Sequence, residues 1–215
     1  MCRSFADVGF RCFEASSIFV PWIAGRRRQM TRTIRLAFIL VLIGIAAPAR
    51  GQATQPGDSA PVVLLVRHAE KAAQPADDPP LTQDGRHRAE ALAAVIKDAH
   101  PTAIITTQLR RTVETAQPSA STTGITPEVV PVASTAEQNA ADVAAAVRKH
   151  IGKTVLVVGH NNTVPLIIAA LGGPKLPSIC EAVYDKQFVL VLGREARLIQ
   201  SRYGAPGLPP TPECN

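Results

Sequence analysis

Three short segments of the sequence carry side chains suited to binding and transferring a phosphoryl group. Arg67 and His68 follow one apolar run, Arg110 and Arg111 follow a second, and His160 follows a third. Arginine binds a phosphate dianion through a planar fork of donors, and a neutral imidazole can attack phosphorus. Cations in the first turn of a helix are unfavourable unless an anion binds there. The pattern predicts His68 as a nucleophile beside a phosphate pocket.

The elements that must position these side chains alternate between strand and helix. Predicted strands begin at Val62, Ala103 and Thr154, predicted helices cover Asp84–Ala99, Glu137–His150 and Val164–Leu171, and a closing hairpin joins Phe188–Leu192 to Ala196–Gln200. Thr82 is expected to cap the first of these helices. The alternation predicts a three-layer α/β/α sandwich with a mostly parallel central sheet. Parallel strands end at one edge of a sheet, so the cationic side chains are expected to converge there.

Four motifs in order resemble those of the histidine phosphatase superfamily, the phosphoglycerate-mutase-like proteins, over residues 61–192. They are Arg67-His68-Ala69-Glu70, Leu81-Thr82-Gln83-Asp84-Gly85, the segment from Thr107 to Ala116, and Gly159-His160-Asn161-Asn162. The resemblance implies a covalent phosphohistidine on His68. It also implies a phosphate pocket made by Arg67, Arg111 and His160, and it selects Arg111 over Arg110.

The general acid is the residue that the motifs leave open. In the mutase-like branch the resemblance implies a glutamate downstream of the second arginine, where Glu137 lies, with Glu128 as a rival. Glu70 beside the nucleophile could also serve, or it could orient the loop after the first strand. The acid-phosphatase branch has aspartate directly after the second histidine, where this chain has Asn161. We predict Glu137 as the acid.

Substrate contacts are expected from the loops around the pocket. Asn161, Glu70 and Lys71 are predicted to bind substrate, and the loops 71–80 and 176–184 are expected to set specificity. The scattered His87, His100 and His150 lack the spacing of metal ligands, so neither a metal nor another cofactor is expected.

The N-terminal segment has the order of a secretory signal peptide. A basic stretch begins at Met30, an apolar run covers 36–47, and small residues follow up to Gly51. The apolar run is shorter than the roughly 20 residues of a membrane span, so no stable anchor is expected. Residues 1–29 are interpreted as an upstream extension from a misassigned start codon, 52–60 as a flexible lead-in and 61–215 as the domain. The protein is expected to be periplasmic or secreted.

Charge and cysteine content agree with export. Residues 1–51 hold eight arginines and two acidic residues, which accounts for the formal net charge of +6 and leaves 15 basic and 15 acidic residues afterwards. The exported part is therefore neutral overall, and nucleic-acid binding is not expected. It keeps two cysteines, Cys180 and Cys214, which in an oxidising compartment are predicted to pair and tie the tail to the domain.

These features together predict an exported, metal-independent phosphomonoester hydrolase acting on a small phosphorylated substrate. The first alternative is a mutase-like phosphotransferase, which export disfavours because glycolytic intermediates are cytoplasmic. The second is a non-catalytic binder of phosphorylated ligands that has kept the pocket and lost the acid. The sequence leaves the physiological substrate and the oligomeric state undetermined.

Overall fold

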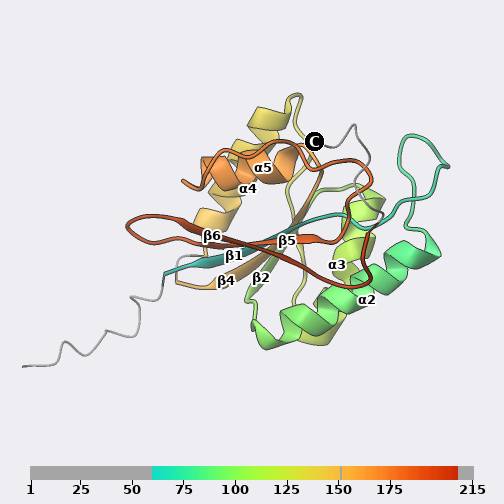
Figure 1. The fold of residues 1–215 in the computed structure, drawn as a ribbon, viewed down its shortest axis with the longest axis horizontal. Coiled ribbons are helices and arrows are strands. Elements are labelled where there is room, and N and C mark those ends of the chain that lie inside the picture. Colours follow the sequence, from blue (N-terminus) through green and yellow to red (C-terminus); the bar gives the residue numbers. More distant parts are fainter. Residues whose placement is uncertain (1–59, 151, 208–215) are drawn as a thin grey trace, which may run out of the picture. The chain divides into compact units, whose positions relative to one another are not determined.

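The computed structural model describes residues 60–150 and 152–207. Within these residues, six strands form one sheet in the order β3-β2-β4-β1-β5-β6 (Figure 1). The strands are β1 (Val62–Arg67), β2 (Ala103–Thr106), β3 (Glu128–Val129), β4 (Thr154–Gly159), β5 (Lys186–Val191) and β6 (Arg197–Arg202). The helices are α2 (Gln83–Asp98), α3 (Arg110–Thr123), α4 (Ala136–Arg148) and α5 (Thr163–Ala170).

The central pair of strands brings two of the predicted site segments together. β1 and β4 run parallel with Arg67 opposite Gly159 in the register. One residue further on, the backbone N–H of His68 donates to the carbonyl oxygen of Gly159 at 2.9 Å. β2 lies parallel on the other side of β4, so the segment leading to Arg111 ends at the same edge.

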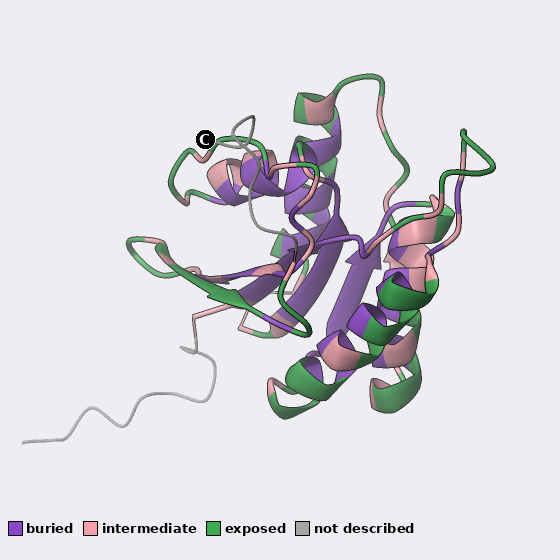
Figure 2. Ribbon diagram, turned by 45° about the vertical axis from the view of Figure 1, so that its right-hand side comes forward, coloured by how far each residue is buried: buried purple, intermediate pink, exposed green. Residues whose placement is uncertain are grey.

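Alternating residues of the strands face two separate helix layers. Val63 and Leu65 of β1 pack in a buried cluster that includes Val143 of α4 and Ile167 of α5. Leu64 and Val66 face the opposite cluster, which holds Leu92 of α2 and Ala116 of α3. Strands buried on both faces produce continuous apolar runs. Figure 2 shows this arrangement, with the central strands buried and the outer helix faces exposed.

The predicted three-layer α/β/α sandwich is confirmed, with small shifts at element ends. The first predicted helix begins one residue earlier, and the hydroxyl of Thr82 caps it by accepting from the Gly85 N–H at 3.1 Å. The helix predicted to end at His150 ends at Arg148. The closing hairpin is present as the antiparallel strands β5 and β6, and β5 also pairs antiparallel with β1. Strand β3 was not predicted, because two residues carry too little periodicity.

The predicted upstream extension and the predicted signal peptide lie outside the described residues, as does Cys214. Among the helices that the structure describes, none combines the length and the apolar character needed to span a bilayer.

Candidate active site

His68 is placed for nucleophilic chemistry by the end of β1. The side chain is 3% exposed, and its Nδ1 lies 2.8 Å from the carbonyl oxygen of Ala69. A carbonyl can only accept, so Nδ1 carries the proton and Nε2 keeps its lone pair. Burial lowers the pKa of His68 to about 3, the Ala69 hydrogen bond opposes this, and the charge of Arg67 adds to it. The ring is therefore neutral near pH 7, as an attacking imidazole must be.

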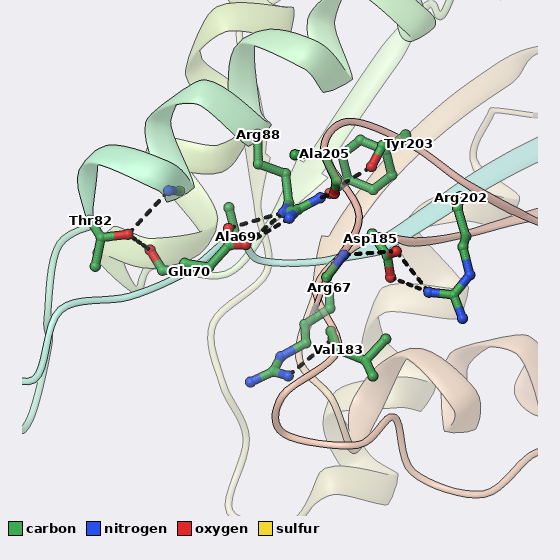
Figure 3. A network of polar contacts seen from close by, with 12 residues as sticks. Arg67, Ala69, Glu70, Thr82, Arg88, Val183, Asp185, Arg202, Tyr203 and Ala205 are labelled. Atoms are coloured by element: carbon green, nitrogen blue, oxygen red, sulfur yellow. Dashed lines mark hydrogen bonds and ion pairs between the residues drawn. The ribbon is translucent and has the colours of Figure 1, made fainter. Parts of the chain in front are cut away.

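Arg67 is held by main-chain carbonyls of residues 180–183, in the loop that precedes β5. Its Nη1 donates to the carbonyl oxygens of Cys180, Glu181 and Val183 at 3.1, 2.6 and 3.3 Å. The guanidinium also stacks on Tyr184, with 4.1 Å from its central carbon to the ring centroid. Figure 3 shows the Arg67 side chain directed toward Val183. These contacts fix a cation that is 1% exposed.

His160 faces His68 from the end of β4. The two ring centroids lie 5.5 Å apart, edge to face. The Thr107 hydroxyl at the end of β2 lies 3.3 Å from Nε2 of His160. Burial lowers the pKa of His160 to about 4, and the charges of Arg111 and Arg67 act in the same direction. His160 is thus neutral near pH 7 when no anion is bound, and a bound dianion would raise this pKa again.

The two neighbouring arginines at the start of α3 have different surroundings. Arg110 is 51% exposed at its side chain and pairs with Glu114 at 3.2 Å, one helical turn away. Arg111 is half-buried, and its Nε has no hydrogen-bond partner. Burial lowers the pKa of Arg111, the negative charge of Asp78 opposes this, and the charge of Arg67 adds to it. A desolvated guanidinium with an unpaired donor is suited to an anionic ligand.

One cavity of about 350 Å³ gathers these groups. His68, Arg111 and His160 line it together with Lys71, Asn161 and Glu181, and another side is formed by the loop 132–135 and the start of α4, with Ala136 and Asn139. Arg67 is not among the lining residues and reaches the site through its contact with Glu181. Of the substrate-binding residues predicted from sequence, Lys71 and Asn161 lie at this cavity. Glu70 lines a larger neighbouring cavity instead.

Glu70 orients the loop that follows the nucleophile. Arg88 holds its carboxylate through Nε and Nη2, with N···O distances of 2.8 to 3.0 Å, as Figure 3 shows. The carbonyl oxygen of Glu70 also accepts from the Thr82 N–H at 2.9 Å. A Cβ on Gly85 would collide with that same carbonyl oxygen. The Leu-Thr-x-x-Gly motif thus lets the first turn of α2 pack against the loop after His68.

The carboxylates proposed as the acid are not in the cavity lining. Glu137 lies in the first turn of α4 and is exposed, although Ala136 beside it lines the cavity. Glu128 pairs with Lys149 at 3.2 Å and with His150 at 3.5 Å. Among the described residues Glu181 is the carboxylate that lines the cavity. Glu181 was not predicted from the sequence as a site residue, although it lies in the loop 176–184 that is expected to set specificity.

Cys180, whose carbonyl oxygen binds Arg67, is disulfide-bonded. Its partner lies outside the described residues, so the pairing with Cys214 stays a prediction. The neighbouring Ile179 is also held in place, because its N–H donates to the carbonyl oxygen of Asn161 at 2.9 Å. The segment therefore connects Arg67 with the end of β4.

No cluster of three or more His, Cys, Asp or Glu side chains within residues 60–207, leaving aside position 151, is arranged to hold a metal ion. The groups gathered at the cavity are instead two imidazoles and a guanidinium, with Arg67 behind them. Two neutral rings and desolvated cations around one space are suited to in-line attack on a phosphorus atom whose oxygens the cations neutralise.

Comparison with known proteins agrees with this geometry. The family model of the histidine phosphatase superfamily (branch 1) matches residues 63–141. SixA from Agrobacterium tumefaciens is 25% identical, with a TM-score of 0.51, over 70% of this chain and 99% of that one. The mycobacterial glucosyl-3-phosphoglycerate phosphatase Rv2419c in complex with VO3 is 18% identical, with a TM-score of 0.52, over 67% and 98% of the two chains. Comparison with curated proteins finds no match.

The matched segment begins in β1 and ends in α4, so it includes His68, Arg67 and Arg111. The Gly-His motif at the end of β4 lies beyond it, and the fold brings His160 against His68. Over this segment and in its fold, the chain is therefore similar to the histidine phosphatase superfamily.

Proposed function

We propose that the chain hydrolyses small phosphomonoesters through a phosphohistidine on His68. The observation that carries this function is the neutral, buried His68 ring, whose Nε2 keeps its lone pair and which lines one cavity with Arg111 and His160. An enzyme with this site is a phosphatase, and its substrate is a small phosphorylated molecule.

In the proposed first step, Nε2 of His68 attacks phosphorus, an N–P bond forms and the P–O bond to the leaving group breaks. Arg67, Arg111 and His160 stabilise the charge on the equatorial oxygens. The leaving oxygen takes a proton from an acid. In the second step water attacks the same phosphorus and gives a proton to the deprotonated acid, the N–P bond breaks, and inorganic phosphate leaves with His68 neutral again.

Turnover of p-nitrophenyl phosphate and glycerol 3-phosphate by the purified protein tests this function. We expect release of inorganic phosphate from both. A mutase-like phosphotransferase would instead return the phosphoryl group to an organic acceptor with little free phosphate. A non-catalytic binder would show no turnover with any phosphomonoester while still binding inorganic phosphate.

Glu137 remains the proposed proton donor on sequence grounds. Two substrates whose leaving groups differ in their need for a proton test this role. If Glu137 protonates the leaving oxygen, Glu137→Gln lowers kcat for glycerol 3-phosphate by about 10², because an alkoxide is a poor leaving group. Turnover of p-nitrophenyl phosphate, whose leaving group needs little protonation, stays within about threefold. Equal changes on both substrates, or none, would exclude Glu137 as the acid.

We propose that the protein is exported to the periplasm or the medium, and two observations support this proposal. The segment 30–51 has the order of a signal peptide, and a disulfide-bonded Cys180 is typical of an oxidising compartment. Fractionation of cells that express the full chain should place a shortened protein outside the cytoplasm. A full-length cytoplasmic product would contradict the proposal.

A further inference from the structure

Arg67 presents an open edge of its guanidinium near the site. Nη1 is committed to three backbone carbonyls, whereas Nε and Nη2 are buried without hydrogen-bond partners. Two neighbouring donors of this kind match two oxygens of a phosphoryl group. The open edge is therefore the side of Arg67 available to substrate.

A carboxylate of the chain already lies at that edge. Oε2 of Glu181 is 2.9 Å from Nη2 of Arg67, as a charge contact without the direction of a hydrogen bond. The Arg67 side chain is 1% exposed but that of Glu181 is 64% exposed, so the carboxylate can leave the guanidinium and be solvated by water. An entering phosphoryl group competes for the same donor and carries more charge, so it can displace the carboxylate.

Displacement of the Glu181 side chain leaves Arg67 in place. The three carbonyls that hold Nη1 belong to the main chain, and the ring of Tyr184 stacks on the guanidinium independently of residue 181. Residue 181 thus has two separable contacts with Arg67. The carbonyl oxygen anchors the arginine, and the carboxylate competes with ligand.

Glu181 also lies at the boundary between two cavities of opposite charge. The smaller one, with His68, is lined by the cations Lys71 and Arg111, which match the two charges of a phosphate dianion. The larger one, of about 750 Å³, is lined by Glu70, Asp84 and Glu181. Its one arginine, Arg88, is already engaged with Glu70 and with the carbonyl oxygens of Tyr203 and Ala205.

We propose that Glu181 is a specificity-determining residue for the leaving group, an inference that rests on the proposed phosphatase function. Its carboxylate lies at the open edge of Arg67 and gives way to the phosphoryl group when substrate binds. It then lies in the wall shared with the acidic cavity, next to the bound substrate. The enzyme accordingly selects phosphomonoesters whose leaving group carries no negative charge.

Glu181→Gln tests both halves of the proposal, because glutamine keeps the size and the main-chain carbonyl and removes the charge. The first measurement is the Kd of inorganic phosphate by calorimetry, which we expect to fall by about two- to fivefold. The second is the ratio of kcat/KM for 3-phosphoglycerate to that for glycerol 3-phosphate, which we expect to rise by about threefold. Both substrates have alkyl leaving groups, so general effects on Arg67 or on proton transfer cancel in the ratio.

Glu195→Gln is the matched control, since Glu195 is exposed in the turn between β5 and β6 and lines neither cavity. It should leave both values unchanged. An unchanged or weaker phosphate affinity in Glu181→Gln would overturn the proposal, and so would an unchanged or lower substrate ratio. Absence of turnover in the wild-type protein would refute the proposed function instead, while the calorimetric measurement would still decide whether Glu181 competes with phosphate.

Discussion

His68→Ala is expected to reduce phosphomonoester turnover to the background rate. The substitution removes Nε2, the atom that forms the bond to phosphorus, while the backbone N–H of residue 68 can still donate to Gly159. Wild-type protein mixed with substrate and quenched with base should carry phosphate that is stable in base and labile in acid, and the variant should carry none. Retained activity in His68→Ala would refute the proposed mechanism.

His68 is buried, so the fold of the variant needs its own measurement. Thermal unfolding should remain cooperative, and inorganic phosphate should still raise the Tm because Arg67, Arg111 and His160 remain. His100→Asn is the control substitution. His100 is exposed, lies outside the catalytic cavity and has a positive φ of 45°, which asparagine tolerates. That variant should keep wild-type turnover.

Arg111→Ala is expected to lower kcat/KM by about 10² or more, the loss associated with removal of one charged contact to the transition state. Arg110→Ala should change it by less than about threefold. The two residues are neighbours on α3, yet Arg111 lines the cavity with a buried unpaired Nε and Arg110 pairs with Glu114 at the surface. Steady-state kinetics with p-nitrophenyl phosphate measures both variants.

The comparison is internally controlled, because both substitutions remove an arginine from the first turn of the same helix. Effects on helix stability are therefore similar and do not produce a large difference in rate. A larger loss in Arg110→Ala would show that the motif is shifted by one residue and that Arg110 faces the phosphate.

The sequence by itself determined the parts of this protein that depend on local patterns. Continuous apolar runs are typical of strands covered on both faces, and they indicated β1, β2 and β4 with His68 and His160 directly after two of them. Because parallel strands end at one edge, this was sufficient to predict that the two histidines converge. The motif register separated Arg111 from Arg110, and the structure gives those residues different surroundings.

Only the tertiary structure decided how Arg67 is held and which carboxylate reaches the cavity. The carbonyls that bind Arg67 come from a loop 113 to 116 residues further along the chain, and no periodicity links such distant positions. Nothing in the local sequence distinguishes Glu137, in the first turn of α4, from Glu181, in the loop before β5. Both side chains are exposed, yet Glu181 lines the cavity and Glu137 does not, which follows from how the loop before β5 packs against the end of β1. Long-range packing of irregular loops leaves no local signal, so the specificity of the site depends on the fold.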